Sequence, residues 1–422
     1  MEKLRIGVFG AARGKTMMRV LLHHPEAALV AVCDKYRPLL DEVTAMAAEQ
    51  GSDVAVYETF DEFLAHDMDA VVLANYATEH APYAIRVLES GRHVMSEVLP
   101  CETMAQAVAL IEAVERTGLV YAYAENYCYM DRTFEMWRRY RRGDVGEITY
   151  AEGEYVHDCT SIWPQITYGE RNHWRNLLHP FYYCTHSLGP ILTISGRRPV
   201  RVSGIATPVI ADSYRKGLGT LNGTAGIEMV TLDNGAIVKS IHGGLKREPS
   251  SVNYEVYGRK GCMETQRFGT ENLNVYIEGE RACHGDLETY LPEKFVSPEL
   301  AAGFGTHGGS DFYATHFFIQ RILGRPEGIQ YSVDVYTAVD MGICGLLAYR
   351  SYLAGGAPVD VPDLRDPAQR DAWRHDNACT NPDVAGDQLL PVFPGLDELG
   401  PVPDEAYERI RGLWLAGKEY EN

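Results

Sequence analysis

Short apolar runs alternate with amphipathic stretches over residues 1–124. The runs with the pattern of strands are Leu4–Phe9, Leu29–Cys33, Val54–Tyr57, Ala70–Leu73, His93–Ser96 and Val120–Tyr123. Apolar residues at helical spacing occupy the stretches near Lys15–His23, Pro38–Glu49, Phe60–Ala65, His80–Ser90 and Met104–Thr117. Because strands that alternate with helices are typical of parallel sheets with right-handed crossovers, we predict an α/β domain here.

The pattern changes after about Asn126, where strands follow one another directly. The predicted strands are Ile148–His157, Val200–Thr207, Gly226–Leu232, Ala236–His242, Tyr254–Tyr257 and Leu273–Ile277. Turns such as Asp233-Asn234-Gly235 separate them and are typical of hairpins. Helices are predicted at Thr133–Arg142, Asp311–Leu323 and Val333–Leu353. We therefore predict an α+β domain with a mostly antiparallel open sheet.

Together these patterns predict three parts, at residues 1–124, 125–362 and 363–422. The last part is rich in Pro, Asp and Gly, and we expect an arm that lies on the surface or on a partner subunit. An antiparallel sheet with helices mainly on one side leaves a face that another subunit often covers. A homodimer or homotetramer is the expected assembly.

Composition and charge narrow the classes of partner. The chain has 422 residues, 45% of them apolar and 23% charged, with a net charge of −19. A protein that binds duplex nucleic acid needs a basic face, and this chain has no long stretch rich in Lys and Arg. The densest basic stretch, residues 137–142, is short and is expected on the exposed side of a helix. The acidic balance also argues against binding to anionic membranes.

The nine cysteines are scattered and never spaced C-x-x-C, which is typical of a reducing compartment. No apolar run reaches the length of a membrane span. A strand pattern begins directly after Met1-Glu2-Lys3, so no signal peptide is expected. These features predict a cytoplasmic protein.

A glycine-containing loop follows the first predicted strand and precedes a helix. It reads Gly10-Ala11-Ala12-Arg13-Gly14. Small residues at such a turn let a pyrophosphate approach backbone N–H groups at the helix N-terminus. Asp34 ends the second strand, 24 residues after Gly10, where an acid accepts a hydrogen bond from a ribose 2′-hydroxyl and repels a 2′-phosphate. The sequence thus predicts a Rossmann domain that prefers NAD to NADP, although Lys35 and Arg37 could tolerate a phosphate.

The first domain also resembles the Gfo/Idh/MocA oxidoreductases. The resemblance rests on Asp69-Ala70-Val71-Val72-Leu73, His80, Gly91-Arg92-His93-Val94, Glu97 and Pro100. It implies an NAD(P)-dependent enzyme that acts on sugars, inositols or related polyols, with Asn75, His80, Glu97 and Asn126 in the cofactor site. In that family the usual motif is Glu-Lys-Pro, with the lysine at the catalytic centre. Here the chain reads Glu97-Val98-Leu99-Pro100, and the lysine is absent.

A narrower resemblance accounts for the missing lysine. The chain is similar to the NAD-dependent α-N-acetylgalactosaminidases of glycoside hydrolase family 109, which also lack it. The matching segments are Ser96-Glu97-Val98, Glu125-Asn126, Glu152–Asp158, Trp174-Arg175, Tyr183–Pro190, His307–Asp311 and Val335-Tyr336. The loop between Asp158 and Tyr183 is shorter than in those enzymes, so we expect a different substrate pocket.

This resemblance implies glycoside cleavage through transient oxidation of the sugar by bound NAD. Loss of a hydride from C3 acidifies the C2 proton, a base removes that proton, and the group on C1 leaves before water adds and the hydride returns. Tyr155 would be the C2 base, His186 would act at the leaving group or C3 hydroxyl, and Tyr183 would hold or activate the sugar. The expected pocket residues are His157, Asp158, Trp174, Arg175 and His307.

Other interpretations of these residues and of the chain stay open. A tyrosine in a sheet is most often packing, and His186 could be a core histidine. His157, Asp158, Cys159 and His186 could bind a metal, although their spacing matches no standard zinc pattern. The tyrosines at 121, 123, 127 and 129 could be core packing or a sugar platform. The alternative functions are plain oxidation or reduction of a free sugar or cyclitol, and a non-enzymatic NAD-bound sensor or assembly subunit.

Overall fold

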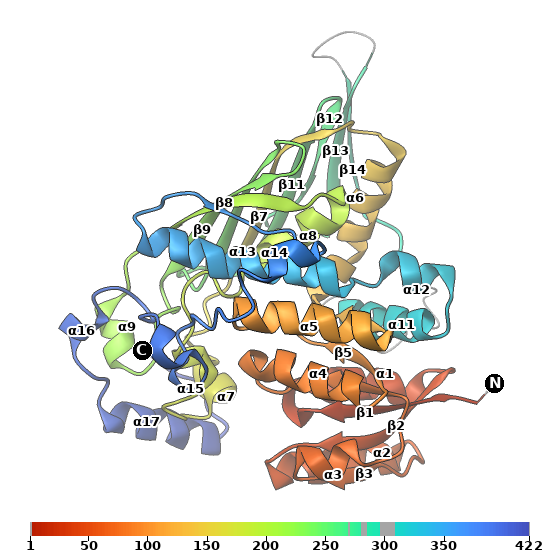
Figure 1. Cartoon of the computed structure of the whole chain (residues 1–422), viewed down its shortest axis with the longest axis vertical. Coiled ribbons are helices and arrows are strands. Elements are labelled where there is room, and N and C mark those ends of the chain that lie inside the picture. Colours follow the sequence, from red (N-terminus) through yellow and green to blue (C-terminus); the bar gives the residue numbers. More distant parts are fainter. Residues whose placement is uncertain (1, 269–270, 280–284, 296–308, 422) are drawn as a thin grey trace. The chain divides into compact units, whose positions relative to one another are not determined.

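The structure is a computed structural model that describes residues 2–268, 271–279, 285–295 and 309–421 (Figure 1). Its chain forms two compact units. The first consists of Met1–Phe134, Glu293–Val339 and Leu364–Arg374, and the second of Glu135–Pro292, Asp340–Asp363 and His375–Asn422.

The first unit contains the predicted parallel sheet. Its strand order is β3-β2-β1-β4-β5-β6, and every pair is parallel. The strands are β1 Leu4–Phe9, β2 Ala27–Cys33, β3 Ala55–Tyr57, β4 Ala70–Leu73, β5 His93–Ser96 and β6 Tyr121–Tyr123. The helices between them are α1 Ala11–His23, α2 Arg37–Glu49, α3 Phe60–Leu64, α4 His80–Glu89 and α5 Met104–Thr117, and α11 Ser310–Ile322 and α12 Pro326–Tyr331 come later in the chain. The predicted Rossmann-type fold is confirmed, because both faces of this apolar sheet are buried as parallel sheets require.

The second unit is built on a largely antiparallel sheet in the order β14-β13-β12-β11-β7-β10-β9-β8-β15. Its strands are β7 Ile148–Val156, β8 Pro199–Ala206, β9 Ala225–Leu232, β10 Ile237–Gly243, β11 Ser251–Gly258, β12 Gly261–Thr265, β13 Leu273–Glu278, β14 Gly285–Tyr290 and β15 Val359–Asp360. The predicted hairpin joins β9 to β10. Only β7 and β10 pair in parallel among the described strands of this sheet. The sequence patterns did not predict β12, β14 and β15.

One buried helix packs directly against this sheet. Helix α8, Thr185–Ser195, lies against β7, and a Cβ on Gly153 of that strand would meet Ser187 O at 1.8 Å. Glycine is therefore required here for the close approach of helix and strand. The hydroxyls of Ser187 and Ser240 share a hydrogen bond of 2.8 Å that links α8 to β10. This packing brings the start of α8 to the end of β7. The other helices of this part of the chain are α6 Asp131–Arg142, α7 Trp163–Thr167, α9 Ala211–Arg215 and α13 Val335–Leu353.

The C-terminal residues form short helices that pack on both units. They are α14 Pro367–Arg370, α15 Pro382–Ala385, α16 Leu396–Leu399 and α17 Asp404–Leu415. In the first unit the buried Arg370 pairs with Glu115 of α5 at 2.6 Å. In the second, Ile410 of α17 packs in a cluster with Trp163 and Leu218. None of the described helices is long and apolar enough to cross a membrane.

Candidate active site

The nucleotide loop of the first unit has the geometry that a pyrophosphate requires. Gly10 has a φ of 101°, and a Cβ there would lie 2.3 Å from the carbonyl oxygen of Ala74. Only glycine fits such a position. Helix α1 begins at the next residue, and Gly10 has no side chain that could cap its first turn. The Asp34 carboxylate accepts hydrogen bonds from the backbone N–H groups of Ala11, at 2.7 Å, and Tyr36, at 2.8 Å, which places it beside the loop.

Arg13 of this loop is held by two buried carboxylates. Its guanidinium lies 2.6 Å from Glu97 and 2.7 Å from Asp311 of α11. Burial lowers the pKa of Arg13, but the two carboxylates outweigh burial and raise its pKa above the ordinary value. Arg13 and Glu97 were predicted as cofactor residues, whereas Asp311 was not predicted as a partner because it lies 298 positions away in the sequence. The two carboxylates thus fix the Arg13 side chain beside the loop.

Asn75 and His80 lie in the segment after β4. His80 is buried, and its ring nitrogens lie 3.1 Å from Leu99 O and 3.3 Å from Asn75 O. Burial lowers the pKa of His80 to about 4, so the ring is neutral and its single N–H can donate to only one of these two carbonyl oxygens at a time. The Asn75 side-chain oxygen is buried and has no hydrogen-bond partner among the described residues. Such an orphaned acceptor fits a donor from a bound nucleotide.

The remaining predicted cofactor residues lie next to this region or along the same loop. Asn126 is buried at the start of a 3-10 turn, Asn126–Tyr129, that Glu125 caps through the N–H of Tyr127. Val98 and Leu99, which replace the family lysine, are both buried. The chain therefore fills the position of that lysine with apolar side chains. Of the four tyrosines at 121, 123, 127 and 129, three are core residues, because the rings of Tyr121, Tyr123 and Tyr129 are almost fully buried.

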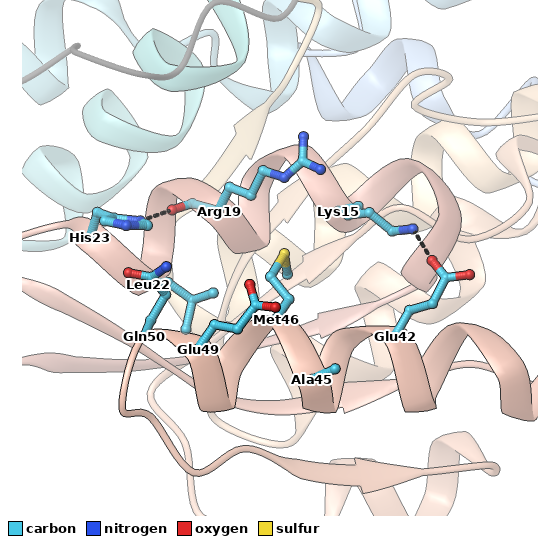
Figure 2. A pocket seen from close by; sticks show the side chains of 9 residues that line it. All are labelled: Lys15, Arg19, Leu22, His23, Glu42, Ala45, Met46, Glu49 and Gln50. Carbon is cyan, nitrogen blue, oxygen red and sulfur yellow. Dashed lines mark hydrogen bonds and ion pairs between the residues drawn. The ribbon is translucent and has the colours of Figure 1, made fainter.

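A separate open cavity of about 520 Å³ lies between α1 and α2 (Figure 2). Its charged lining is partly neutralised, because Lys15 pairs with Glu42 at 2.5 Å. His23 Nδ1 donates to the carbonyl oxygen of Arg19 in the same helix. None of the predicted cofactor residues lines this cavity, so it is distinct from the nucleotide loop.

The predicted catalytic residues of the second unit come together. Tyr155 is near the end of β7, and Tyr183 and His186 flank the start of α8. The His186 ring centroid lies 4.7 Å from that of Tyr155 and 5.1 Å from that of Tyr183. The Tyr254 hydroxyl donates to the His186 carbonyl oxygen at 2.6 Å and fixes its backbone. Tyr183 and His186 are 28 and 31 positions from Tyr155 in the chain, and the fold brings all three into one cluster.

Tyr155 has a second polar neighbour in His157. The Tyr155 hydroxyl lies 3.2 Å from His157 Nδ1, and the two rings meet edge to face. Burial lowers the pKa of His157 below its ordinary value, although Asp158 opposes that shift. A neutral imidazole can accept the phenol proton of Tyr155. The pair therefore has the chemistry of a base with its own proton acceptor.

Asp158 is already occupied by protein groups. It accepts hydrogen bonds from the Thr160 backbone N–H at 3.0 Å, the Thr160 hydroxyl at 2.5 Å and Lys246 Nζ at 3.0 Å. Burial raises the pKa of Asp158, but these donors outweigh it and lower the pKa below the ordinary value. Asp158 also lines a cavity of about 340 Å³ together with Lys246 and Glu248. It is an ionised structural anchor at the edge of that cavity rather than a proton donor.

Trp174 and Arg175 extend the aromatic cluster. The Trp174 ring stacks on Tyr183 at 5.8 Å with an interplanar angle of 14°. The Arg175 guanidinium lies over Trp174 at 4.3 Å and near the Tyr183 ring at 5.5 Å. His173 Nδ1 accepts from the Arg175 backbone N–H at 3.2 Å and fixes this turn. A flat aromatic surface beside a guanidinium suits a sugar, whose C–H groups pack on rings while its hydroxyls take donors.

Two predictions fall outside this cluster. His307 lies outside the described residues. The metal alternative has no support among the residues that the structure describes, because they contain no group of three or more His, Cys, Asp or Glu side chains that could hold an ion. Cys159 packs instead against the cluster around Trp163.

Sequence patterns missed one residue of the site, His242. It lies near the end of β10, directly beside Tyr155 of β7 in the sheet. The strand Ala236–His242 was predicted, but nothing in the sequence indicates that β10 pairs with β7 in parallel. An alignment of His242 with Tyr155 depends on that register.

Comparisons with known proteins agree with this architecture. The NAD-binding Rossmann fold of the oxidoreductase family GFO_IDH_MocA matches residues 4–125, and the C-terminal domain of glycosyl hydrolase 109 matches residues 213–373. The chain therefore has a Gfo/Idh/MocA NAD-binding domain followed by a glycosyl hydrolase 109 C-terminal domain, which confirms the resemblance. The cluster around Tyr155, Tyr183 and His186 lies between the two matched segments.

The relatives with curated names come from the same group. A glycosyl hydrolase family 109 protein of Saccharopolyspora erythraea is 27% identical over 392 residues, which are 86% of this chain and 83% of the relative. An alpha-N-acetylgalactosaminidase of Shewanella oneidensis is 24% identical over 411 residues, with 89% and 87% covered.

Solved structures of similar fold include dehydrogenases. A levoglucosan dehydrogenase in complex with NADH and levoglucosan has a TM-score of 0.67 at 16% identity and covers 86% of this chain and 100% of that one. The scyllo-inositol dehydrogenase of Lactobacillus casei with bound NAD(H) and scyllo-inositol has a TM-score of 0.66 at 18% identity and covers 86% of this chain and 100% of that one. An apo structure of scyllo-inositol dehydrogenase from the same organism has a TM-score of 0.66 at 17% identity, with 86% and 99% covered. These likenesses confirm the fold.

Proposed function

We propose that this protein is an NAD-dependent enzyme that cleaves a glycosidic bond through transient oxidation of its sugar. The observation that carries the proposal is the Tyr155–His157 pair, 3.2 Å apart, within the Tyr183 and His186 cluster. The glycosyl hydrolase 109 match and the named alpha-N-acetylgalactosaminidase relative support it. The replacement of the family lysine by buried Val98 and Leu99 favours it over simple oxidation.

The nucleotide loop fits NAD, which supplies a temporary hydride acceptor for C3 of the sugar when bound. Gly10, Arg13 and Asn75 would hold the cofactor, and Asp34 would hold its adenosine ribose. To accept a hydrogen bond from a ribose hydroxyl, the Asp34 carboxylate would have to give up the hydrogen bond from the Ala11 N–H or accept both. An acid at this position favours NAD over NADP.

The tyrosines and histidines would then move protons on the sugar. Tyr155 removes the C2 proton once C3 is a ketone, and His157 takes up the Tyr155 proton that prepares this base. The C1–O bond breaks as C1=C2 forms, and His186 donates a proton to the departing oxygen. Water then adds at C1, C2 regains a proton, and the C3 ketone takes back the hydride and becomes a hydroxyl again. Tyr183, with Trp174 and Arg175 beside it, holds the sugar ring. Each group acts over a hydrogen-bond distance with the substrate.

A second candidate function is oxidation of a free sugar or cyclitol. The observation in its favour is the fold likeness to a levoglucosan dehydrogenase and a scyllo-inositol dehydrogenase. The same Tyr155 and His186 would serve there as the base for the hydroxyl that is oxidised. The two functions differ in whether the cofactor is consumed.

A panel of p-nitrophenyl glycosides without added NAD tests the proposal. We expect at least one glycoside to release p-nitrophenol in many turnovers with no rise in NADH absorbance, because the hydride returns within each cycle. Free sugars and cyclitols with added NAD form the parallel arm. Accumulation of NADH with those, and no p-nitrophenol from any glycoside, would establish the dehydrogenase instead.

We also propose a homodimer or homotetramer that forms through the outer face of the larger sheet. The strand register places four exposed apolar side chains on one face, opposite to Tyr155: Ile205, Met229, Tyr257 and Leu287. Charged pairs such as Lys239–Glu152 lie among them. A second copy of the chain suits such a face, since apolar strand faces are commonly covered in assemblies.

Light scattering should therefore give a mass of two or four chains. The variant Met229→Glu, which places a charge on that face, should shift the mass toward one chain while far-ultraviolet circular dichroism stays unchanged. A wild-type protein that is monomeric at working concentration would exclude this assembly.

A further inference from the structure

His242 completes a closed group of four rings in the second unit. Its ring is parallel to that of Tyr155, with centroids 5.6 Å apart and an interplanar angle of 3°. It also stacks on Tyr183 at 5.7 Å and 18°. His186 contacts the same two tyrosines from its own position. Each histidine thus touches both tyrosines, and three of the four residues are those proposed to carry the reaction.

The hydrogen bonds of His242 define which ring nitrogen carries the proton. Nδ1 lies 3.3 Å from the carbonyl oxygen of Pro180, which can only accept, so Nδ1 is the protonated nitrogen. Burial and the neighbouring His186 lower the pKa of His242 to about 3, and the ring is neutral at ordinary pH. In that tautomer Nε2 is a pure acceptor.

Nε2 has no protein partner in this arrangement. It points away from Pro180, and the hydrogen bond that His242 makes with the described residues uses Nδ1 instead. The side chain is only 5% exposed. An acceptor that no protein group meets is usually satisfied in native sites by water or by a ligand. The group that meets Nε2 must be a donor that fits among aromatic rings.

We propose that Nε2 of His242 accepts a hydrogen bond from a hydroxyl of the bound sugar and is a substrate-binding residue of this site. A sugar hydroxyl is such a donor, and the C–H groups beside it pack on Tyr155 and Tyr183. The inference rests on the proposed function in that the ligand is a sugar. It does not depend on whether that sugar is cleaved or oxidised.

Two matched substitutions separate this contact from a structural role. His242→Asn retains a donor at the position of Nδ1 toward Pro180 but has no atom at Nε2. His179→Asn is the control, because His179 is equally buried, adjoins Pro180, and stacks on Tyr349 at 4.2 Å outside the four-ring group. Its Nδ1 accepts from the Phe181 N–H at 3.2 Å, a bond that the asparagine oxygen can keep. His242→Gln, which carries an acceptor near the Nε2 position, tests rescue.

The measurement is calorimetric affinity of the purified holoprotein for monosaccharides and their monodeoxy analogues, which needs no turnover. For the sugar that wild type binds, we expect His242→Asn to weaken affinity about 10- to 100-fold, His242→Gln to restore part of it, and His179→Asn to leave it within about twofold of wild type. One deoxy analogue should bind equally well to wild type and to His242→Asn, because the hydroxyl that Nε2 contacts is already missing from it. That analogue identifies the contacted hydroxyl.

The outcomes distinguish this inference from the proposed reaction. The contact between His242 Nε2 and a sugar hydroxyl would be overturned if wild type and His242→Asn bound the sugar equally well. It would also be overturned if His242→Asn weakened the binding of every deoxy analogue as much as it weakens the binding of the parent sugar. Failure of a wild type that binds sugar to cleave any glycoside would overturn the proposed reaction alone. A wild-type holoprotein that binds no sugar at millimolar concentration would overturn both.

Discussion

Tyr155→Phe should lower turnover about 100- to 10,000-fold, the typical effect of removing a positioned acid or base. The substitution keeps the ring, and with it the contacts to His186 and His242. It removes only the hydroxyl that lies 3.2 Å from His157. We therefore expect the fold and the nicotinamide nucleotide content to survive while the chemistry fails.

Exchange of the C2 proton with solvent identifies the lost step. Turnover in deuterated water should place deuterium at C2 of the released sugar, because C2 is deprotonated only after C3 is oxidised. In Tyr155→Phe this exchange should fall in parallel with cleavage. Mass spectrometry and proton NMR of the product measure both.

The chain offers a matched control on the same strand. Tyr150 of β7 donates its hydroxyl to Glu152 at 2.7 Å, and it is five positions from Tyr155, so it points to the other face of the sheet. Tyr150→Phe should leave turnover within about twofold of wild type. Full activity in Tyr155→Phe would show that another residue is the C2 base. A 3-keto product with stoichiometric NADH and no deuterium at C2 would show a dehydrogenase.

Arg13→Met should strongly destabilise the first unit. The substitution removes the cation between Glu97 and Asp311, which are 6% and 1% exposed. Breaking a buried ion pair by removing one partner costs about 3–5 kcal/mol, because a charge is left without compensation. Arg13 itself is 31% exposed, so we expect about 3 kcal/mol of unfolding free energy, measured by urea denaturation.

The pH dependence of this loss follows from the two carboxylates. Without Arg13 they repel each other when ionised, so the folded variant takes up protons more readily than its unfolded chain does. Stability of the variant relative to wild type should then recover as pH falls below about 5. Nicotinamide nucleotide content should also fall, since the loop loses its positive charge.

An exposed ion pair of the same unit serves as the control for Arg13. Arg116 lies 2.6 Å from Glu89, and both side chains are more than half exposed. Solvent screens such a pair, so Arg116→Met should change stability by less than about 1 kcal/mol. If Arg13→Met is no more destabilising than Arg116→Met, the two buried carboxylates have found other partners and the role assigned to Arg13 is wrong.

Much of the fold was readable from the chain because local patterns determine it. The runs at Leu4–Phe9, Ala70–Leu73 and His93–Ser96 became strands with those bounds, and Met104–Thr117 became a helix with those bounds. Alternation of strand and helix predicted the parallel sheet. The strands β12, β14 and β15 were missed; β14 is mostly exposed and so lacks an apolar face, and β15 has only two residues.

The sequence by itself therefore predicted the two sheet types, the glycine turn at Gly10 and six residues of the candidate cluster, since these depend on local periodicity, backbone sterics and motifs: Tyr155, His157, Trp174, Arg175, Tyr183 and His186. Only the tertiary structure decided that Asp311 meets Arg13 and that His242 lies beside Tyr155. Both contacts join segments far apart in the chain. Ion-pair partners and strand register depend on which elements pack together, and no local pattern contains that information.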